Sequence, residues 1–135
     1  MTLLRVALVQ LDAGGDADRN IAVAAELADR ADADGARLVA LPEYLQYRGD
    51  DDGFRASARP IPGPFTAAFA AVAKRRSAWI LAGTLAEVSG DSLRPYNTSV
   101  LIDPAGTITA RYRKIHALRL RSEAVTFLIL RRKRY

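Results

Sequence analysis

Two short apolar segments, separated by an amphipathic one, constrain the fold of this 135-residue chain more than any other feature. Residues 5–10 and 38–41 are apolar runs bounded by turn-forming residues, which is typical of buried strands. Between them the sequence predicts a helix that is capped by Asp16 or Asp18, runs to about residue 34 and stops at Gly35. The apolar face of this helix comprises Ile21, Ala24, Ala25, Ala28 and Ala31. Strand, helix and strand in this order predict two parallel strands joined by a right-handed crossover.

The rest of the chain extends this unit into a mixed sheet. Further along, the sequence predicts a polar loop over 44–64, a helix over 65–76 and strands over 79–84, 98–102 and 107–113. The segment Asp103-Pro-Ala-Gly fits a type I turn, which makes the last two strands an antiparallel hairpin. The predicted fold class is therefore α/β, with a mixed sheet and two covering helices.

The composition excludes several kinds of chemistry. The chain has no cysteine, so it has no disulfide, no thiolate metal site and no cysteine nucleophile of its own. His116 is the only histidine, and neither a G-x-G-x-x-G nor a G-x-S-x-G motif is present, so we expect no metal and no cofactor. The sequence shows neither an apolar run of ~20 residues nor the features of a secretory signal, so we expect no membrane span and a cytoplasmic location.

Charge is distributed unevenly along the chain. Residues 1–110 carry 11 basic against 14 acidic side chains, a net charge of −3. Residues 111–135 carry nine basic side chains against Glu123 alone, a net charge of +8. A uniformly basic fold would suggest a nucleic acid partner, but an acidic body with a basic end does not, and we expect no nucleic acid partner for the fold.

Two charged residues stand where open α/β sheets gather reacting groups, just beyond the carboxyl ends of strands. Glu43 follows the second predicted strand and Lys114 follows the fifth. A carboxylate and an ammonium at such positions suit a general base and a cation that stabilises developing negative charge. Spacing alone leaves open that both are solvated surface residues. The same holds for the acidic run at 50–52, a candidate for a hard cation, and for Tyr44 and Tyr47, candidates for lining a pocket.

Several segments, taken together, point to a family. Residues 35–44 read Gly-Ala-Arg-Leu-Val-Ala-Leu-Pro-Glu-Tyr, and residues 96–116 combine Tyr-Asn-Thr-Ser with the predicted hairpin and end in Tyr-Arg-Lys-Ile-His. Three shorter segments accompany them in order, at residues 5–10, 62–65 and 82–84. In this order and spacing the segments resemble the nitrilase superfamily of carbon–nitrogen hydrolases over most of the chain.

The resemblance implies the N-terminal half of an αββα sandwich and a Glu–Lys–Cys mechanism that hydrolyses a small amide or nitrile. By match of motif, Glu43 would be the general base and Lys114 would stabilise the tetrahedral intermediate, while a cysteine attacks the carbon. The family commonly self-associates, so a homo-oligomer is a further expectation. Half a sandwich would leave one apolar sheet face uncovered, so we expect an isolated chain to be molten, aggregated or dependent on a partner.

The resemblance stops after His116. The family continues with a loop, a second glutamate and the strand that ends in the nucleophilic cysteine, and Glu123 matches no such motif. We therefore divide the chain into a truncated carbon–nitrogen hydrolase domain, residues 1–117, and a basic tail, residues 118–135. Two explanations of the tail stay open: a genuine basic extension, or the product of a frameshift or early stop.

Two functional interpretations follow from these observations. In the first, the chain is an N-terminal fragment of a carbon–nitrogen hydrolase that has no turnover as written, because Glu43 has no thiol to activate. In the second, it is a non-enzymatic binding module, or an inactive partner of an intact paralogue, that uses its basic C-terminal tail.

Overall fold

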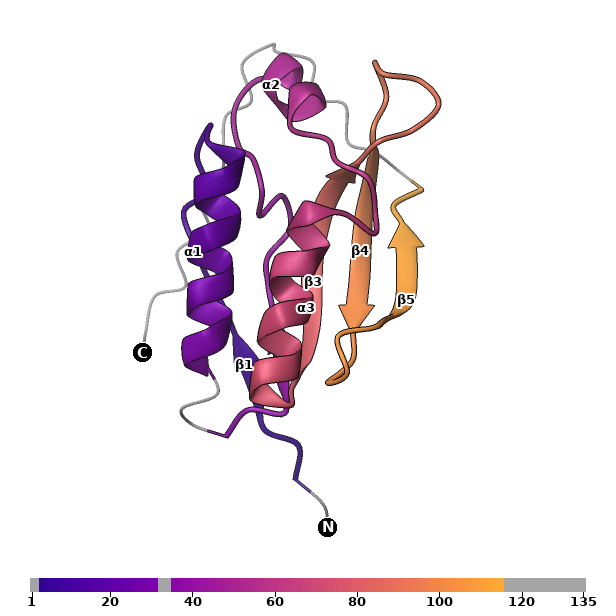
Figure 1. Ribbon diagram of the computed structural model, residues 1–135. Coiled ribbons are helices and arrows are strands. Elements are labelled where there is room, and N and C mark those ends of the chain that lie inside the picture. Colours follow the sequence, from indigo (N-terminus) through magenta and orange to yellow (C-terminus); the bar gives the residue numbers. More distant parts are fainter. Residues whose placement is uncertain (1–2, 32–34, 116–135) are drawn as a thin grey trace, which may run out of the picture.

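The computed structural model describes residues 3–31 and 35–115, which form a five-stranded sheet with helices against one face (Figure 1). Along the chain the elements are β1 (Val6–Leu8), α1 (Ala17–Arg30), β2 (Leu38–Ala40), α2 (Asp51–Ala56), α3 (Pro64–Arg76), β3 (Trp79–Glu87), β4 (Tyr96–Ile102) and β5 (Ile108–Arg113). The predicted α/β class is confirmed, and α1 and α3 are the two covering helices. His116, Glu123 and the basic tail lie outside the described residues, so the boundary at residue 117 stays a prediction.

The strands lie in the sheet in the same order as in the chain. β1, β2 and β3 pair in parallel, as the strand–helix–strand pattern predicts, whereas β3, β4 and β5 pair antiparallel. Because two antiparallel steps restore the original direction, β5 runs the same way as β2. The carboxyl ends of β2 and β5 therefore lie at the same edge of the sheet.

The two covering helices are joined by charge at their C-terminal ends. Asp16 caps α1 by accepting a hydrogen bond from the backbone N–H of Arg19 at 3.0 Å. Asp29 of α1 accepts hydrogen bonds from Arg75 and Arg76 of α3 at 2.8 and 2.7 Å. The bonds from Arg76 and then Arg75 hold the pKa of Asp29 at about 2.

None of the described helices has the length and apolarity that crossing a membrane requires.

The predicted polar loop over 44–64 is wrong in one part, because it contains the helix α2. Asp50 caps this helix by accepting a hydrogen bond from the backbone N–H of Gly53 at 2.7 Å. A six-residue helix with a glycine in its interior shows no helical periodicity, so the pattern resembles a loop. The acidic run at 50–52 forms the cap and the first turn of α2, where carboxylates are favoured.

β3 and β4 are longer than the apolar runs indicated, whereas β1, β2 and β5 are shorter than the predicted 5–10, 38–41 and 107–113. β3 continues to Glu87 and β4 begins at Tyr96, whereas the predicted strands were 79–84 and 98–102. The pairing of β3 with β4 shifts its register between Ala82 and Leu85. Such a bulge interrupts the alternation of side chains, so the sequence pattern ends before the strand does.

The core lies between the sheet and the helices. One row of residues, in register across the whole sheet, points toward α1 and α3: Ala7, Val39, Ile80, Ile102 and Ile108. Val39, Ile80 and Ile102 are at most 1% exposed and belong to the same apolar cluster as Phe69 of α3. Burial of these side chains is the main stabilising contribution on this face.

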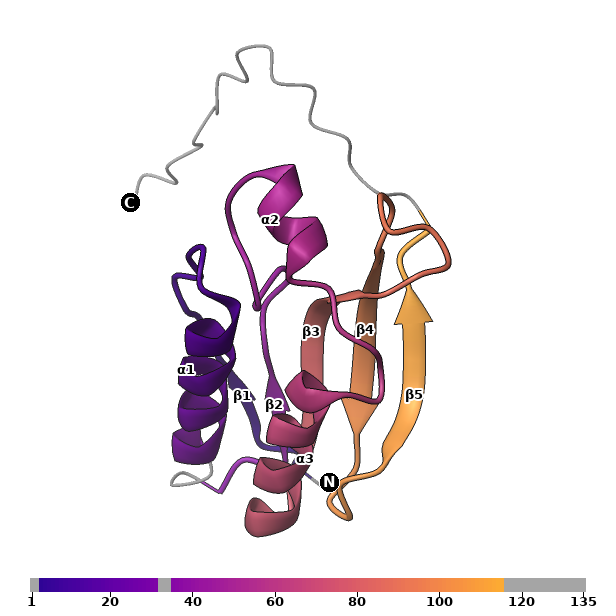
Figure 2. The same ribbon diagram turned by 45° about the horizontal axis from the view of Figure 1, so that its top comes forward.

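The opposite face of the sheet is apolar and open. It carries two further rows in register: Val6, Leu38 and Trp79, and Leu8, Ala40, Leu81, Leu101 and Ala110. Leu8 is 79% exposed and Trp79 36% exposed. The two covering helices, α1 and α3, lie on the other side of the strands (Figure 2). The uncovered apolar face expected for half a sandwich is therefore present in the part of the chain that the structure describes.

Candidate active site

Glu43 and Lys114, 71 positions apart in the sequence, meet at the carboxyl edge of the sheet. Lys114 Nζ donates a hydrogen bond to Glu43 Oε1 at 2.7 Å, and the two form an ion pair. Glu43 follows β2 and Lys114 follows β5, so β3 and β4 lie between the two strands that position them. The side chains are 47% and 33% exposed. The structure thus places in contact the two residues that the sequence indicated for chemistry.

Close packing of the β2 extension, residues 41–43 directly after that strand, against β3 fixes the backbone on both sides of Glu43. A Cβ added to Gly83 would lie 1.9 Å from the carbonyl oxygen of Pro42, so only glycine permits this approach. The next residue, Thr84, accepts a hydrogen bond from the backbone N–H of Tyr44 at 2.9 Å through its Oγ1. Gly83 and Thr84 lie in the β3 bulge, which frees them to pack against the residues around Glu43.

The two tyrosines near Glu43 pack rather than line a cavity. Tyr44 has a φ of +54°, a left-handed conformation that is uncommon for residues with a side chain. Its ring lies edge-on to that of Phe54 in α2, with 5.4 Å between the ring centroids. The Tyr47 hydroxyl donates a hydrogen bond to Asp50 Oδ1 at 3.4 Å. Backbone strain such as the positive φ of Tyr44 is often found at functional sites, and Tyr44 directly follows Glu43.

Asn97 of β4 contacts both members of the pair. Its side-chain Nδ2 donates a hydrogen bond to Glu43 Oε1 at 3.1 Å. Its backbone carbonyl oxygen accepts one from the backbone N–H of Lys114 at 2.8 Å. The sequence alone did not single out this residue. The only signal for it was its place in the Tyr-Asn-Thr-Ser segment that carries the family resemblance.

The contact with Glu43 favours the charged form of Lys114. The hydrogen bond to Glu43 raises the pKa of Lys114 above its ordinary 10.5, while burial acts in the opposite direction. The charges of Glu43, Tyr44 and Tyr112 add to the rise. Lys114 is therefore an ammonium at neutral pH, which stabilises negative charge and has no free pair to accept a proton. In this pair only Glu43 is able to act as a base.

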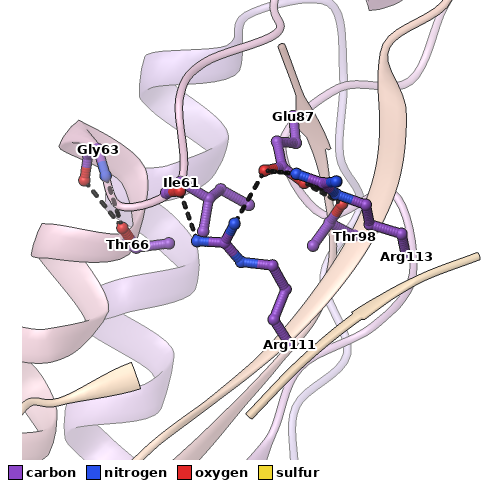
Figure 3. Close-up of polar contacts among 7 residues, drawn as sticks. All are labelled: Ile61, Gly63, Thr66, Glu87, Thr98, Arg111 and Arg113. Carbon is purple, nitrogen blue, oxygen red and sulfur yellow. Dashed lines mark hydrogen bonds and ion pairs between the residues drawn. The ribbon is translucent and has the colours of Figure 1, made fainter. Parts of the chain in front are cut away.

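A second carboxylate, Glu87 at the end of β3, holds the strand that leads to Lys114 (Figure 3). Glu87 accepts hydrogen bonds from Arg113 at 2.8 and 2.9 Å, from Arg111 at 3.2 Å and from Thr98 at 2.7 Å. Its side chain is 4% exposed, and the bond from Arg113 keeps its pKa below the ordinary value despite burial. The sequence held no sign of this cluster, because its members come from three strands.

Other features of the described residues lie apart from the pair. A hollow of about 830 Å³ runs along β1 beside α1, with Arg5, Asp29 and Arg76 among its lining, and neither Glu43 nor Lys114 borders it. Among the described residues, 3–31 and 35–115, no group of three acidic or histidine side chains is placed to hold a metal ion. The second glutamate that the resemblance implies would follow His116, outside the described residues.

These observations define an α/β protein with a carboxylate–ammonium pair at the carboxyl edge of its sheet, the usual location of reacting groups in such folds. The model of the family described as carbon-nitrogen hydrolase matches residues 5–130, and the chain belongs to that family. The nitrilase-superfamily resemblance recognised in the sequence is thereby confirmed.

Relatives and solved structures agree with this assignment. The chain is 35% identical over 116 residues to the human protein named Omega-amidase NIT2, covering 86% of this chain and 41% of that protein. It is 35% identical over 121 residues to the Arabidopsis thaliana protein named Omega-amidase, chloroplastic, covering 86% and 32%. Among solved structures, Saccharomyces cerevisiae Nit3, described as a member of branch 10 of the nitrilase superfamily, superposes with a TM-score of 0.72 at 27% identity, covering 84% of this chain and 44% of Nit3.

The NitFhit protein of C. elegans shows the same fold, with a TM-score of 0.76 at 23% identity over 88% of this chain and 30% of that one. The chain therefore spans less than half the length of each of these proteins.

Proposed function

We propose that this chain supplies the general base, Glu43, and the charge-stabilising cation, Lys114, for hydrolysis of the carbon–nitrogen bond of a small amide. The observation that carries the proposal is the 2.7 Å contact between these two side chains at the carboxyl edge of the sheet. Family membership supports it, because the pair occupies the motif positions that the resemblance assigns to the base and the cation.

The chemistry requires a thiol, a base and a cation. Glu43 takes the proton of a thiol, the sulfur attacks the carbonyl carbon, and the carbonyl electrons move to oxygen, where the Lys114 ammonium stabilises the resulting charge. The intermediate collapses, the carbon–nitrogen bond breaks, and the nitrogen takes the proton from Glu43 and leaves. Water, deprotonated by Glu43, then attacks the thioester, which releases the carboxylic acid and restores the thiol.

The nucleophile of this reaction is not among the 135 residues, since they contain no cysteine. The exposure of the pair shows a second feature that a complete site needs, which is cover from water. Glu43 and Lys114 are partly exposed, whereas stabilisation of an oxyanion is strongest in a site that excludes water. We therefore expect these residues alone to give no turnover, and a complete site to need further chain that brings the thiol and covers the pair.

The substrate class is proposed from the named relatives. Both curated relatives above are named omega-amidases, so a small molecule with a terminal primary amide is the preferred substrate. A nitrile is the other substrate that the resemblance allows. No observation within the described residues favours the binding-module alternative, because that alternative rests on residues 118–135.

The test is a chimera in which residues 1–117 of this chain replace the aligned segment of the human relative, so that the relative supplies the cysteine. We expect the chimera to release ammonia from succinamate, a terminal amide, and the 135-residue chain to release none. Glu43→Gln and Lys114→Met in the chimera should each lower kcat/KM at least ~100-fold, because each removes a group used in the transition state.

The matched control is Glu26→Gln, which removes an exposed carboxylate on α1 and should leave kcat/KM unchanged. Turnover by the chimera that survives Glu43→Gln at the parental rate would show that Glu43 is not the base. Ammonia release by the 135-residue chain would show that the nucleophile lies within it.

A further inference from the structure

Asn97 makes contacts that link the two members of the pair. It precedes Thr98, which pairs with Arg113, so its backbone lies opposite Lys114 across the β4–β5 ladder. Residues opposite each other in an antiparallel pair project their side chains to the same face. Asn97 thus bonds the backbone N–H of Lys114 through its backbone carbonyl oxygen at 2.8 Å, and the Glu43 carboxylate through its side-chain amide at 3.1 Å.

Charge fixes the orientation of the Asn97 side chain. Glu43 Oε1 already accepts a hydrogen bond from Lys114, and an ionised carboxylate only accepts, so the amide must present its NH₂ group to Glu43. The amide oxygen then faces away from Glu43. Asn97 is only 7% exposed, and this oxygen, Oδ1, is buried. It has no hydrogen-bond partner within the described residues.

An unpartnered buried oxygen is unfavourable for stability, because it has lost its bonds to water without replacement. An apolar side chain of the same size would avoid this penalty. The asparagine at position 97 is therefore poorly explained by stability. Residues that break a local packing rule in this way are found mostly at functional sites.

The pair also needs more than its own attraction to hold one geometry. Exposed ion pairs between long side chains contribute little, because holding both side chains in place opposes their attraction. Glu43 and Lys114 are 47% and 33% exposed, so each retains access to water. A third contact, from a side chain that is itself buried, restricts the Glu43 carboxylate to the position beside Lys114.

We propose that Asn97 is a positioning residue that holds the Glu43 carboxylate against Lys114. Its side-chain oxygen stays buried without a hydrogen-bond partner, which is unfavourable for stability. This inference rests on the proposed function, in which that carboxylate is the base. It predicts that Asn97 matters for the geometry of the pair and not for the stability of the fold.

The test uses the chimera labelled with [ε-¹³C]lysine, in which the signal of Lys114 is identified as the one that Lys114→Met removes. The pKa of Lys114 is read from the pH dependence of its Cε shift, and stability from the midpoint of thermal unfolding. In Asn97→Leu, the pKa of Lys114 should fall toward 10.5, because Glu43 is no longer held beside it. The midpoint should stay unchanged or rise, since the unpartnered oxygen is gone.

The matched control is Thr98→Val, at the neighbouring position of β4. It removes the hydrogen bond to Glu87 on the other face of the sheet, so the unfolding midpoint should fall while the pKa of Lys114 stays as in the parent. Asn97→Ala provides a second substitution should Asn97→Leu not fold. In the chimera, either Asn97 variant should lower kcat at least about 10-fold with little change in KM, because a misplaced base slows chemistry and leaves binding intact.

The outcomes separate this inference from the proposed function. If the pKa of Lys114 is raised in the parent and equally raised in both Asn97 variants, or if kcat of the chimera is unaffected, Asn97 does not position the base. A lower unfolding midpoint with an unchanged Lys114 pKa identifies a purely structural residue and also overturns the inference. If the parent shows no raised Lys114 pKa, the Glu43–Lys114 pair is absent in solution, and the proposed function fails with it.

Discussion

In the chimera, Gly83→Ala is expected to lower the free energy of unfolding by about 3 kcal/mol or more and to separate Glu43 from Lys114. The added methyl carbon would lie 1.9 Å from the carbonyl oxygen of Pro42 and 2.3 Å from that of Leu41. Both obstructing atoms belong to the backbone, so no side-chain rotation relieves the overlap. The β2 extension must move away from β3, and it carries Glu43 with it.

Urea unfolding at pH 7 measures the first effect, and titration of Lys114 measures the second. The hydrogen bond to Glu43 is the main cause of the raised pKa of Lys114, so a displaced Glu43 should return that pKa toward 10.5. Gly90→Ala is the matched control, because a Cβ at Gly90 meets no atom within 4 Å. Equal stability of the two variants would show that the approach of Pro42 to Gly83 is not as close as the structure has it.

In the same chimera, Glu87→Gln is expected to lower the free energy of unfolding at pH 7 by about 2–3 kcal/mol. Glu87 is the shared partner of Arg111 and Arg113, and the substitution leaves both guanidinium groups without a carboxylate. The effect stays below the full penalty for a broken buried pair, because the two arginine side chains are 34% and 46% exposed and regain water. Thr98 keeps a hydrogen-bond acceptor in the amide.

This effect should depend on pH in a defined direction. The pKa of Glu87 is lowered below 4.5 in the folded chain, chiefly by the hydrogen bond from Arg113, so its contribution is complete above pH 4.5 and is lost as the pH falls through the folded-state value. The difference in unfolding free energy between the parent and Glu87→Gln should therefore shrink in acid. Denaturant unfolding at several pH values between 7 and 2.5 measures it.

Asp91→Asn is the control for Glu87→Gln. Asp91 pairs with Arg94 at the surface, where the side chains are 54% and 73% exposed, and loss of such a pair changes stability by less than ~0.5 kcal/mol. A difference between Glu87→Gln and the parent that is just as small at pH 7, or that grows in acid, would contradict the account of Glu87 as the anchor of β5.

Local patterns were enough for the elements with regular periodicity. The helix between two apolar runs predicted α1 and the parallel pairing of β1 with β2, and the turn at Asp103 predicted the hairpin of β4 and β5. These features depend on neighbours within a few residues, so the sequence displays them directly. α2 was missed because six residues with Gly53 in their interior show no period.

The candidate residues Glu43 and Lys114 were also visible in the sequence, since each directly follows a strand and matches a family motif. Their contact was not, because it depends on elements far apart in the chain. Strand order and direction place the ends of β2 and β5 at one edge. The backbone approach at Gly83 and the side chain of Asn97 then bring the carboxylate and the ammonium within 2.7 Å.

The sequence by itself thus determined the fold class, the family and the two residues most suited to acid–base chemistry. Only the tertiary structure decided that these residues pair, that Asn97 holds them and that Glu87 secures the strand before Lys114. The physical reason is that periodicity and turn chemistry act over a few residues. A site on a sheet, in contrast, is assembled across strands, where the geometry of each contact is set by the packing of all the strands together.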